Sequence, residues 1–81
     1  MVEVNLWSGL RSLTGGELAI AVDASTIGEM LDALVAAHPG LGPVIEAGVS
    51  VVVDGEIVAA NRSVPLGPAN EIYIVRKLRG G

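Results

Sequence analysis

Apolar and polar residues alternate in two short runs near the start of the chain. The apolar members of these runs are Val2, Val4, Leu6, Leu18, Ile20 and Val22. Because a period of two sends successive side chains to opposite faces of a strand, both runs predict half-buried strands. The turn-rich stretch SGLRSLTGG lies between them. Residues 1–22 are therefore expected to form two strands joined by a loop of about ten residues.

The next segment has the period of an amphipathic helix. Its apolar positions are Ile27, Met30, Leu31, Leu34 and Val35. This spacing places them on one helix face. Thr26 and Glu29 form a capping box, in which the Thr26 hydroxyl accepts from the Glu29 amide and the Glu29 side chain reaches back. The helix is expected to end at His38-Pro39-Gly40, because proline disfavours the helical conformation of the residue before it.

The second half of the chain carries three more strand patterns. Residues 40–48, GLGPVIEAG, are expected to be a connector with one helical turn. The β-branched run at residues 49–53 and the run at residues 56–58 flank Asp54-Gly55, which is a strong hairpin signal. Prolines and glycines keep residues 60–70 irregular. The last strand is expected at residues 71–75, with Ile72 and Ile74 on one face and Tyr73 and Val75 on the other.

The resulting order of elements is β-β-α-β-β-β, which is an α+β arrangement with one helix covering one face of a mixed sheet. A chain of 81 residues buries only about 60% of its unfolded surface, so all of these elements must share one core. We expect a single domain at residues 1–75, followed by an exposed tail at residues 76–81.

Charge divides the chain at the same place. All nine acidic residues lie in residues 1–75, where only Arg11 and Arg62 are basic, whereas residues 76–81 carry three basic side chains. An acidic body disfavours binding to nucleic-acid phosphates. Three basic residues are too few to anchor a protein to a membrane without a second signal. The chain also lacks an apolar run long enough for a membrane span and the pattern of a signal peptide, so we expect a cytoplasmic protein that binds neither nucleic acid nor membrane.

Sequence motifs of enzymes are missing. The glycine-rich stretch at residues 9–16 contains no phosphate-binding motif and is interpreted as a connector. With no cysteine and a single histidine, His38, the chain has no metal-binding cluster, and His38 is assigned to helix termination. No serine lies in a nucleophile-elbow motif. Glu29 and Asp32 lie on the solvated helix face, and Asp54 and Glu56 are explained by the hairpin turn, so no site for turnover is expected.

The remaining candidate is the sequence RKLRGG at residues 76–81. It follows a strand directly and is expected to leave a rigid sheet edge. Six extended residues reach about 20 Å, which is far enough to enter the active site of another protein. Glycine has no Cβ, so Gly80 and Gly81 would let the carboxylate pass through a narrow channel to a nucleotide phosphate. This tail favours activation of the Gly81 carboxylate in the site of a partner.

Over essentially its whole length the chain resembles the ubiquitin-like β-grasp sulfur carriers, the group of the molybdopterin synthase small subunit and the thiamine-pathway sulfur carrier. The resemblance lies in GLRSLTGG, TIGEMLDALVAAHPGLG, VVVDGEIV, VPLGPANEIYIV and the final Gly80-Gly81. It implies a β-grasp fold. The diglycine is the part that the family uses in its function.

The resemblance also implies a mechanism and partners. An E1-like enzyme would adenylate Gly81 with ATP, and sulfur would then replace one oxygen to give a thiocarboxylate. Gly80 would provide clearance, and Arg76, Lys77, Leu78 and Arg79 would bind the partner. The thiocarboxylate would deliver sulfur to a synthase large subunit, with molybdopterin synthesis favoured by the length and the HPGLG segment. The chain itself would be a carrier, not an enzyme, and would bind no cofactor.

The basic residues before the diglycine depart from the bacterial sulfur carriers, which often have proline and alanine there. LRGG is how ubiquitin ends, so conjugation of Gly81 to lysines is an alternative. A non-covalent β-grasp binding module is a third reading. Trp7 and Tyr73 are assigned to packing, although the outer sheet face near Tyr73 is a candidate docking surface.

Overall fold

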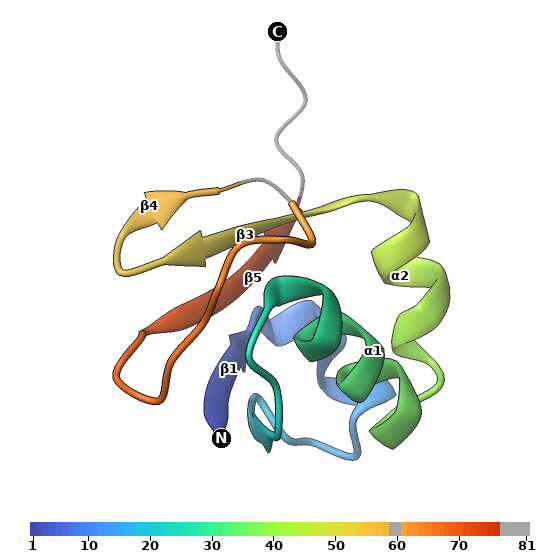
Figure 1. Cartoon of the computed structure of the whole chain (residues 1–81). Helices are drawn as coiled ribbons and strands as arrows, with labels where there is room; N and C mark the ends of the chain where they lie inside the picture. Colours follow the sequence, from blue (N-terminus) through green and yellow to red (C-terminus); the bar gives the residue numbers. More distant parts are fainter. Residues whose placement is uncertain (59–60, 77–81) are drawn as a thin grey trace, which may run out of the picture.

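The computed structural model describes residues 1–58 and 61–76. Five strands form one sheet, and two α-helices and a 3-10 helix accompany it (Figure 1). The strands are β1 (Val2–Leu6), β2 (Ala19–Val22), β3 (Val49–Val53), β4 (Glu56–Ile57) and β5 (Ile72–Arg76). The helices are η1 (Ser8–Leu13), α1 (Ile27–Ala37) and α2 (Leu41–Ala47).

The sheet has the strand order β2-β1-β5-β3-β4. β1 and β5 pair in parallel, whereas the pairs β1–β2, β3–β5 and β3–β4 are antiparallel. The first and last strands of the chain therefore lie side by side in the middle of the sheet. The mixed sheet with α1 packed on it confirms the α+β class and the β-grasp arrangement.

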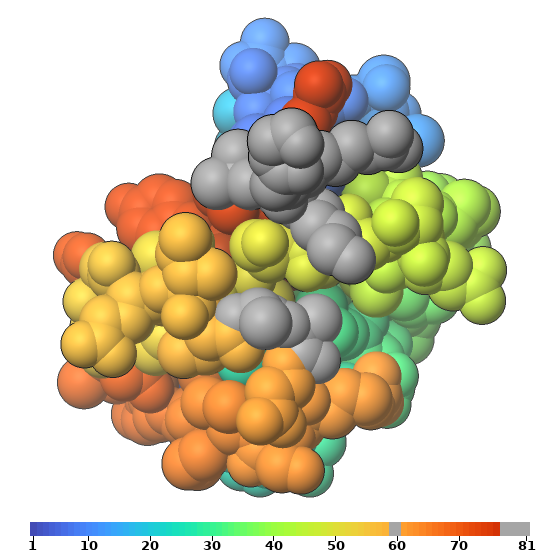
Figure 2. Space-filling view, turned by 90° about the horizontal axis from the view of Figure 1, so that it is seen from above, coloured from blue at the N-terminus to red at the C-terminus, as the bar shows by residue number. Residues whose placement is uncertain are grey.

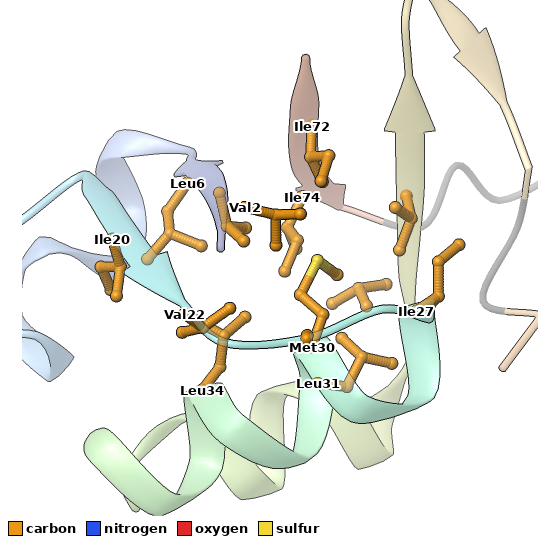
Figure 3. Packing of buried hydrophobic residues seen from close by; sticks show 14 of the residues in the cluster. Val2, Leu6, Ile20, Val22, Ile27, Met30, Leu31, Leu34, Ile72 and Ile74 are labelled. Carbon is orange, nitrogen blue, oxygen red and sulfur yellow. The ribbon is translucent and has the colours of Figure 1, made fainter. Parts of the chain in front are cut away.

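The hydrophobic core fills the space between α1 and the sheet. From α1, Met30 and Leu34 point toward the strands, where Ile72 and Ile74 of β5 meet them (Figure 3). Aromatic residues are nearly absent from the chain, so branched aliphatic side chains supply almost all of this core. Alternation in the strands explains the packing, because every second residue of β1, β2 and β5 is buried.

The N-terminus of α1 confirms one half of the predicted capping box. The Glu29 amide donates to the Thr26 hydroxyl at 3.2 Å. The second half is wrong, because the Glu29 carboxylate accepts from the amide and the hydroxyl of Ser25 and thus reaches one residue further back than Thr26. At the other end, His38 is the C-cap, as expected.

The predicted hairpin between β3 and β4 is confirmed. Asp54 and Gly55 both have positive φ angles, 51° and 84°, as a tight two-residue turn between strands requires. β5 runs from Ile72 to Arg76, so the last strand begins and ends one residue later than expected. Its side chains alternate as predicted.

Two connectors are more regular than the sequence suggested. Residues 41–47 form the helix α2 instead of a single turn, because Pro43 lies in its first turn, where a missing amide is tolerated, and Leu41 anchors it in the core. Residues 8–13 form the 3-10 helix η1 with Leu10 buried. Among the described residues, no helix has both the length and the apolar character that crossing a membrane would require.

The segment at residues 61–70 is irregular, as predicted, but it is firmly attached to α1. The amides of Ile27 and Gly28 donate to the carbonyls of Val64 and Arg62, each at 3.0 Å. The Leu66 amide donates to the Ser25 carbonyl at 2.8 Å. The first two bonds satisfy amides at the start of α1 that would otherwise lack an intrahelical partner.

Candidate functional site

The predicted tail divides at Arg76. Arg76 is the last residue of β5 and pairs with Val49 of β3, so it belongs to the sheet and not to the tail. The other predicted site residues lie outside the described part of the chain: Lys77, Leu78, Arg79, Gly80 and Gly81. Their predicted roles therefore stay predictions. What the structure describes is the base from which this segment continues.

That base is the central strand of the sheet. β5 lies between β1 and β3, and two of its own side chains, Ile72 and Ile74, are buried in the core. The expectation that the tail leaves a sheet edge is wrong. The alternating pattern of residues 72–75 fits a central and an edge strand equally well, so it could not distinguish them. The pairing with β1 ends at Ile74, whereas the pairing with β3 continues to Arg76, so the last residue of β5 is held from the β3 side.

Trp7 and Gly9 surround the end of β5. The Arg76 guanidinium carbon lies 6.0 Å from the centroid of the Trp7 ring, at the outer range of a cation–π contact. Figure 2 shows the red end of β5 against the blue segment that follows β1. A Cβ atom on Gly9 would lie 2.7 Å from the Trp7 Nε1 atom. Trp7 packs against the core, as the sequence predicted, but its contact with Arg76 was missed.

On the face of the sheet opposite α1, a row of mostly apolar side chains crosses β5. Strand pairing aligns Asn5, Tyr73, Val52 and Ile57 across four strands. Tyr73 is 46% exposed and Ile57 is 61% exposed. Because Ile72 and Ile74 point into the core, these alternate residues point to the other side. The row therefore provides exposed apolar side chains on the face that the helices leave uncovered.

The carboxylates that the sequence considered as acid–base groups have structural partners. Asp32 forms an ion pair with Arg62 at 2.8 Å, and both side chains are exposed. Hydrogen bonds from the backbone and the hydroxyl of Ser25 hold the pKa of the Glu29 carboxyl below its usual value. These contacts fasten residues to the start of α1.

Asp54 has a role that the hairpin turn does not explain. Its carboxylate accepts from the side-chain amide of Asn70 at 2.7 Å and from the Glu71 backbone amide at 2.8 Å. The Asp54 amide in turn donates to the Glu71 carbonyl at 2.8 Å. Assigning Asp54 to the turn alone was therefore incomplete, since it also ties the hairpin to the start of β5.

The glycine-rich stretch uses its backbone internally. The amides of Thr14 and Gly16 both donate to the Arg11 carbonyl, at 3.3 and 2.9 Å. The Thr14 hydroxyl, which is buried, bonds the Glu17 carbonyl. These bonds agree with the interpretation of this stretch as a connector.

Comparisons of the whole chain with solved structures find the same fold. SAMP1 from Haloferax volcanii is 27% identical, with 99% of this chain and 98% of that one covered and a TM-score of 0.72. CysO from Mycobacterium tuberculosis is 18% identical, with coverage of 96% and 100% and a TM-score of 0.82. A chain of the Amycolatopsis orientalis BexX/CysO complex is 22% identical, with full coverage of both chains and a TM-score of 0.78.

No match is found among curated protein sequences. The sequence model of the ThiS family, however, matches residues 4–81 and thus covers the fold from Val4 of β1 onward, including the segment that follows β5. The β-grasp fold and the family match are what the resemblance predicted. The chain therefore belongs to the ThiS family, the ubiquitin-like β-grasp sulfur carriers.

Proposed function

We propose that this ThiS-family chain carries sulfur as a thiocarboxylate on Gly81 for cofactor biosynthesis, and we favour molybdopterin as the product. The observation that carries the proposal is the family match through residues 80–81, where the sequence is Gly-Gly. The partners would be an E1-like adenylating enzyme and a sulfur-accepting synthase large subunit. The chain would be a cosubstrate without catalytic groups of its own.

The chemistry balances as two displacements at the Gly81 carboxylate. One carboxylate oxygen attacks the α-phosphorus of ATP in the partner's site, and pyrophosphate leaves. A hydrosulfide ion then attacks the acyl carbon, AMP leaves with that oxygen, and loss of the proton gives the thiocarboxylate, so one oxygen is exchanged for sulfur. ATP is bound by the partner, and the missing Cβ atoms of Gly80 and Gly81 would provide the clearance that this approach needs.

The described residues support the proposal through the base of this segment. β5 is the central strand, and its last residue, Arg76, is paired with Val49 of β3, so the chain continues from a residue of the sheet. The row formed by the exposed Tyr73 and Ile57 and the half-buried Val52 lies on β5, β4 and β3 and is a candidate docking surface for the adenylating enzyme. In a partner bound to this face, the start of the segment that follows β5 would lie at a defined position.

Intact-mass spectrometry of the protein purified from its host tests the proposal. We expect a species heavier by the exchange of one oxygen for sulfur, which alkylation of the thiocarboxylate would shift further. Deletion of Gly80 and Gly81 should remove this species while the circular dichroism and the unfolding midpoint stay unchanged. If the truncated protein kept full function in its host, a role for the Gly81 carboxylate would be wrong.

A second candidate function is protein modification through Gly81. It is favoured by the LRGG sequence at residues 78–81 and by the likeness to SAMP1, which is described as a small archaeal modifier protein. Because Arg79 precedes the two glycines, trypsin would leave a Gly-Gly remnant on any acceptor lysine. Peptide mapping of high-mass conjugates from the host therefore identifies this function directly.

The chain has a single lysine, Lys77, and its other four positively charged side chains are arginines. Conjugates of the protein with itself would therefore have to use Lys77 or the amino terminus. Finding remnants on other host proteins, with no sulfur-containing species, would favour the modifier over the carrier. The cytoplasmic location expected from the sequence stays a prediction.

A further inference from the structure

Trp7 lies beneath the side chain of Arg76, the last residue of β5. It follows β1 directly and is the N-cap of η1, with extended backbone angles of φ −74° and ψ 155°. Its ring is half-buried against the core, so its position is fixed from below. The Arg76 guanidinium carbon stands 6.0 Å over that ring. A fixed aromatic surface thus meets the side chain of the residue at which β5 ends.

Gly9 leaves the space in which the Trp7 ring lies. A Cβ atom at position 9 would be 2.7 Å from Trp7 Nε1, 3.0 Å from Trp7 Cδ1 and 3.7 Å from Arg76 Nη2. A separation of 2.7 Å is shorter than real Cβ contacts, so any larger residue would force the ring to move. The missing side chain of Gly9 therefore permits the contact between Trp7 and Arg76.

We infer that Trp7 is a positioning residue, which holds Arg76 paired with Val49 and thereby sets the length of chain available beyond the sheet. The functional part of this inference rests on the sulfur-carrier proposal. Each residue of strand pairing that opens would add about 3.3 Å of free chain. A partner's active site lies at a fixed distance from its docking surface, so a variable starting point would reduce productive engagement.

The expected size of the effect follows from the contact. A cation–π contact at an exposed site is worth about 0.5–1 kcal/mol, which corresponds to roughly a two- to five-fold change in the equilibrium constant between the paired and the open state of Arg76. Loss of the contact should therefore weaken the reaction by at most a similar factor, without unfolding the protein.

Two observations on the isolated chain test the contact itself. Trp7 is the only tryptophan, so its fluorescence reports on this ring alone. Arg76→Met should change that emission, whereas Arg11→Met, which removes the same charge from η1, should not. Gly9→Ala should lower the NMR order parameter of the Arg76 amide, whereas Gly42→Ala, whose new Cβ would make an ordinary 3.7 Å contact with Val35, should leave it unchanged.

The thiocarboxylated fraction in protein from the host tests the functional consequence. We expect a decrease of up to about five-fold for Arg76→Met and Gly9→Ala, a partial recovery for Arg76→Lys, and no change for Arg11→Met and Gly42→Ala. Unchanged fluorescence and an unchanged Arg76 order parameter would overturn the inference. So would a sulfur load that stays at the wild-type level in both test variants.

A failure of the proposed function is separately visible. If the wild-type protein carried no sulfur, the carrier proposal would fall. The fluorescence and NMR results would still decide whether Trp7 holds Arg76 at the end of β5. Gly9→Ala leaves both Trp7 and Arg76 in place, so a change in that variant reports on their geometry and not on a missing group.

Discussion

The two faces of the sheet are built by the same strands and differ completely in exposure. On the face toward α1, Ile72 of β5 has no exposed surface, whereas its neighbour Tyr73 on the opposite face is 46% exposed. A single step along a strand thus separates a core position from a surface position. The side chains on the covered face therefore contribute most of the folding stability. Those on the uncovered face are less constrained by packing and are available to bind a partner.

The largest expected effect comes from comparing Ile72→Ala with Tyr73→Ala. Ile72→Ala creates a cavity at a fully buried position and should lower the free energy of unfolding by about 2–5 kcal/mol. Tyr73→Ala should lower it by less than about 1 kcal/mol, the cost of reduced strand propensity at a half-exposed site. Urea unfolding monitored by circular dichroism measures both. Similar losses in the two variants would break the comparison.

Asp54 should be an exception to this division, because it is exposed and still matters for stability. Asp54→Ala removes two hydrogen-bond acceptors and leaves alanine at a φ of 51°. The expected loss is about 1–3 kcal/mol. Asp54→Asn should cost less, because asparagine tolerates this conformation and keeps one acceptor oxygen. Equal losses of stability in the two variants would argue against a contribution from backbone strain at the positive φ angle of residue 54.

Ile57→Ser sharpens the role of the uncovered face. Ile57 is 61% exposed in the two-residue strand β4, so the free energy of unfolding should change by no more than about 0.5 kcal/mol. The thiocarboxylated fraction in the host should nevertheless fall, because an apolar contact with the partner is lost. Leu13→Ser is the control, since it removes an exposed apolar side chain beside the start of α2. A normal sulfur load in Ile57→Ser would exclude this part of the face from docking.

The smallest effect concerns Glu29, on the exposed side of the helix that covers the core. Hydrogen bonds from Ser25 lower the pKa of Glu29 in the folded protein below its ordinary value of 4.5. Stability from this contact is therefore fully present above pH 4.5 and is lost as the pH falls through the lowered pKa. Unfolding midpoints of wild type and Glu29→Gln should differ at neutral pH and converge in acid. A constant difference would show that ionisation of Glu29 is not involved.

Residues close together in the chain carry most of what the sequence predicted. The period of residues 27–35 predicted α1, Thr26 predicted its start, and Asp54-Gly55 predicted the hairpin. Each of these signals acts within a few residues and needs no distant partner. The helix α2 is longer than the single turn predicted for residues 40–48, because Pro43 lies in its first turn, where proline is tolerated.

The sequence by itself therefore determined the five strands, the helix α1, the single core and the family resemblance. Only the tertiary structure decided that β5 is central, that β1 and β5 run in parallel, and that Trp7 meets Arg76. The physical reason is that these contacts join opposite ends of the chain. Alternation of apolar and polar residues predicts which side chains of a strand are buried. The partner of each strand depends on how the apolar faces of all elements pack into one core, and no local sequence pattern contains this information.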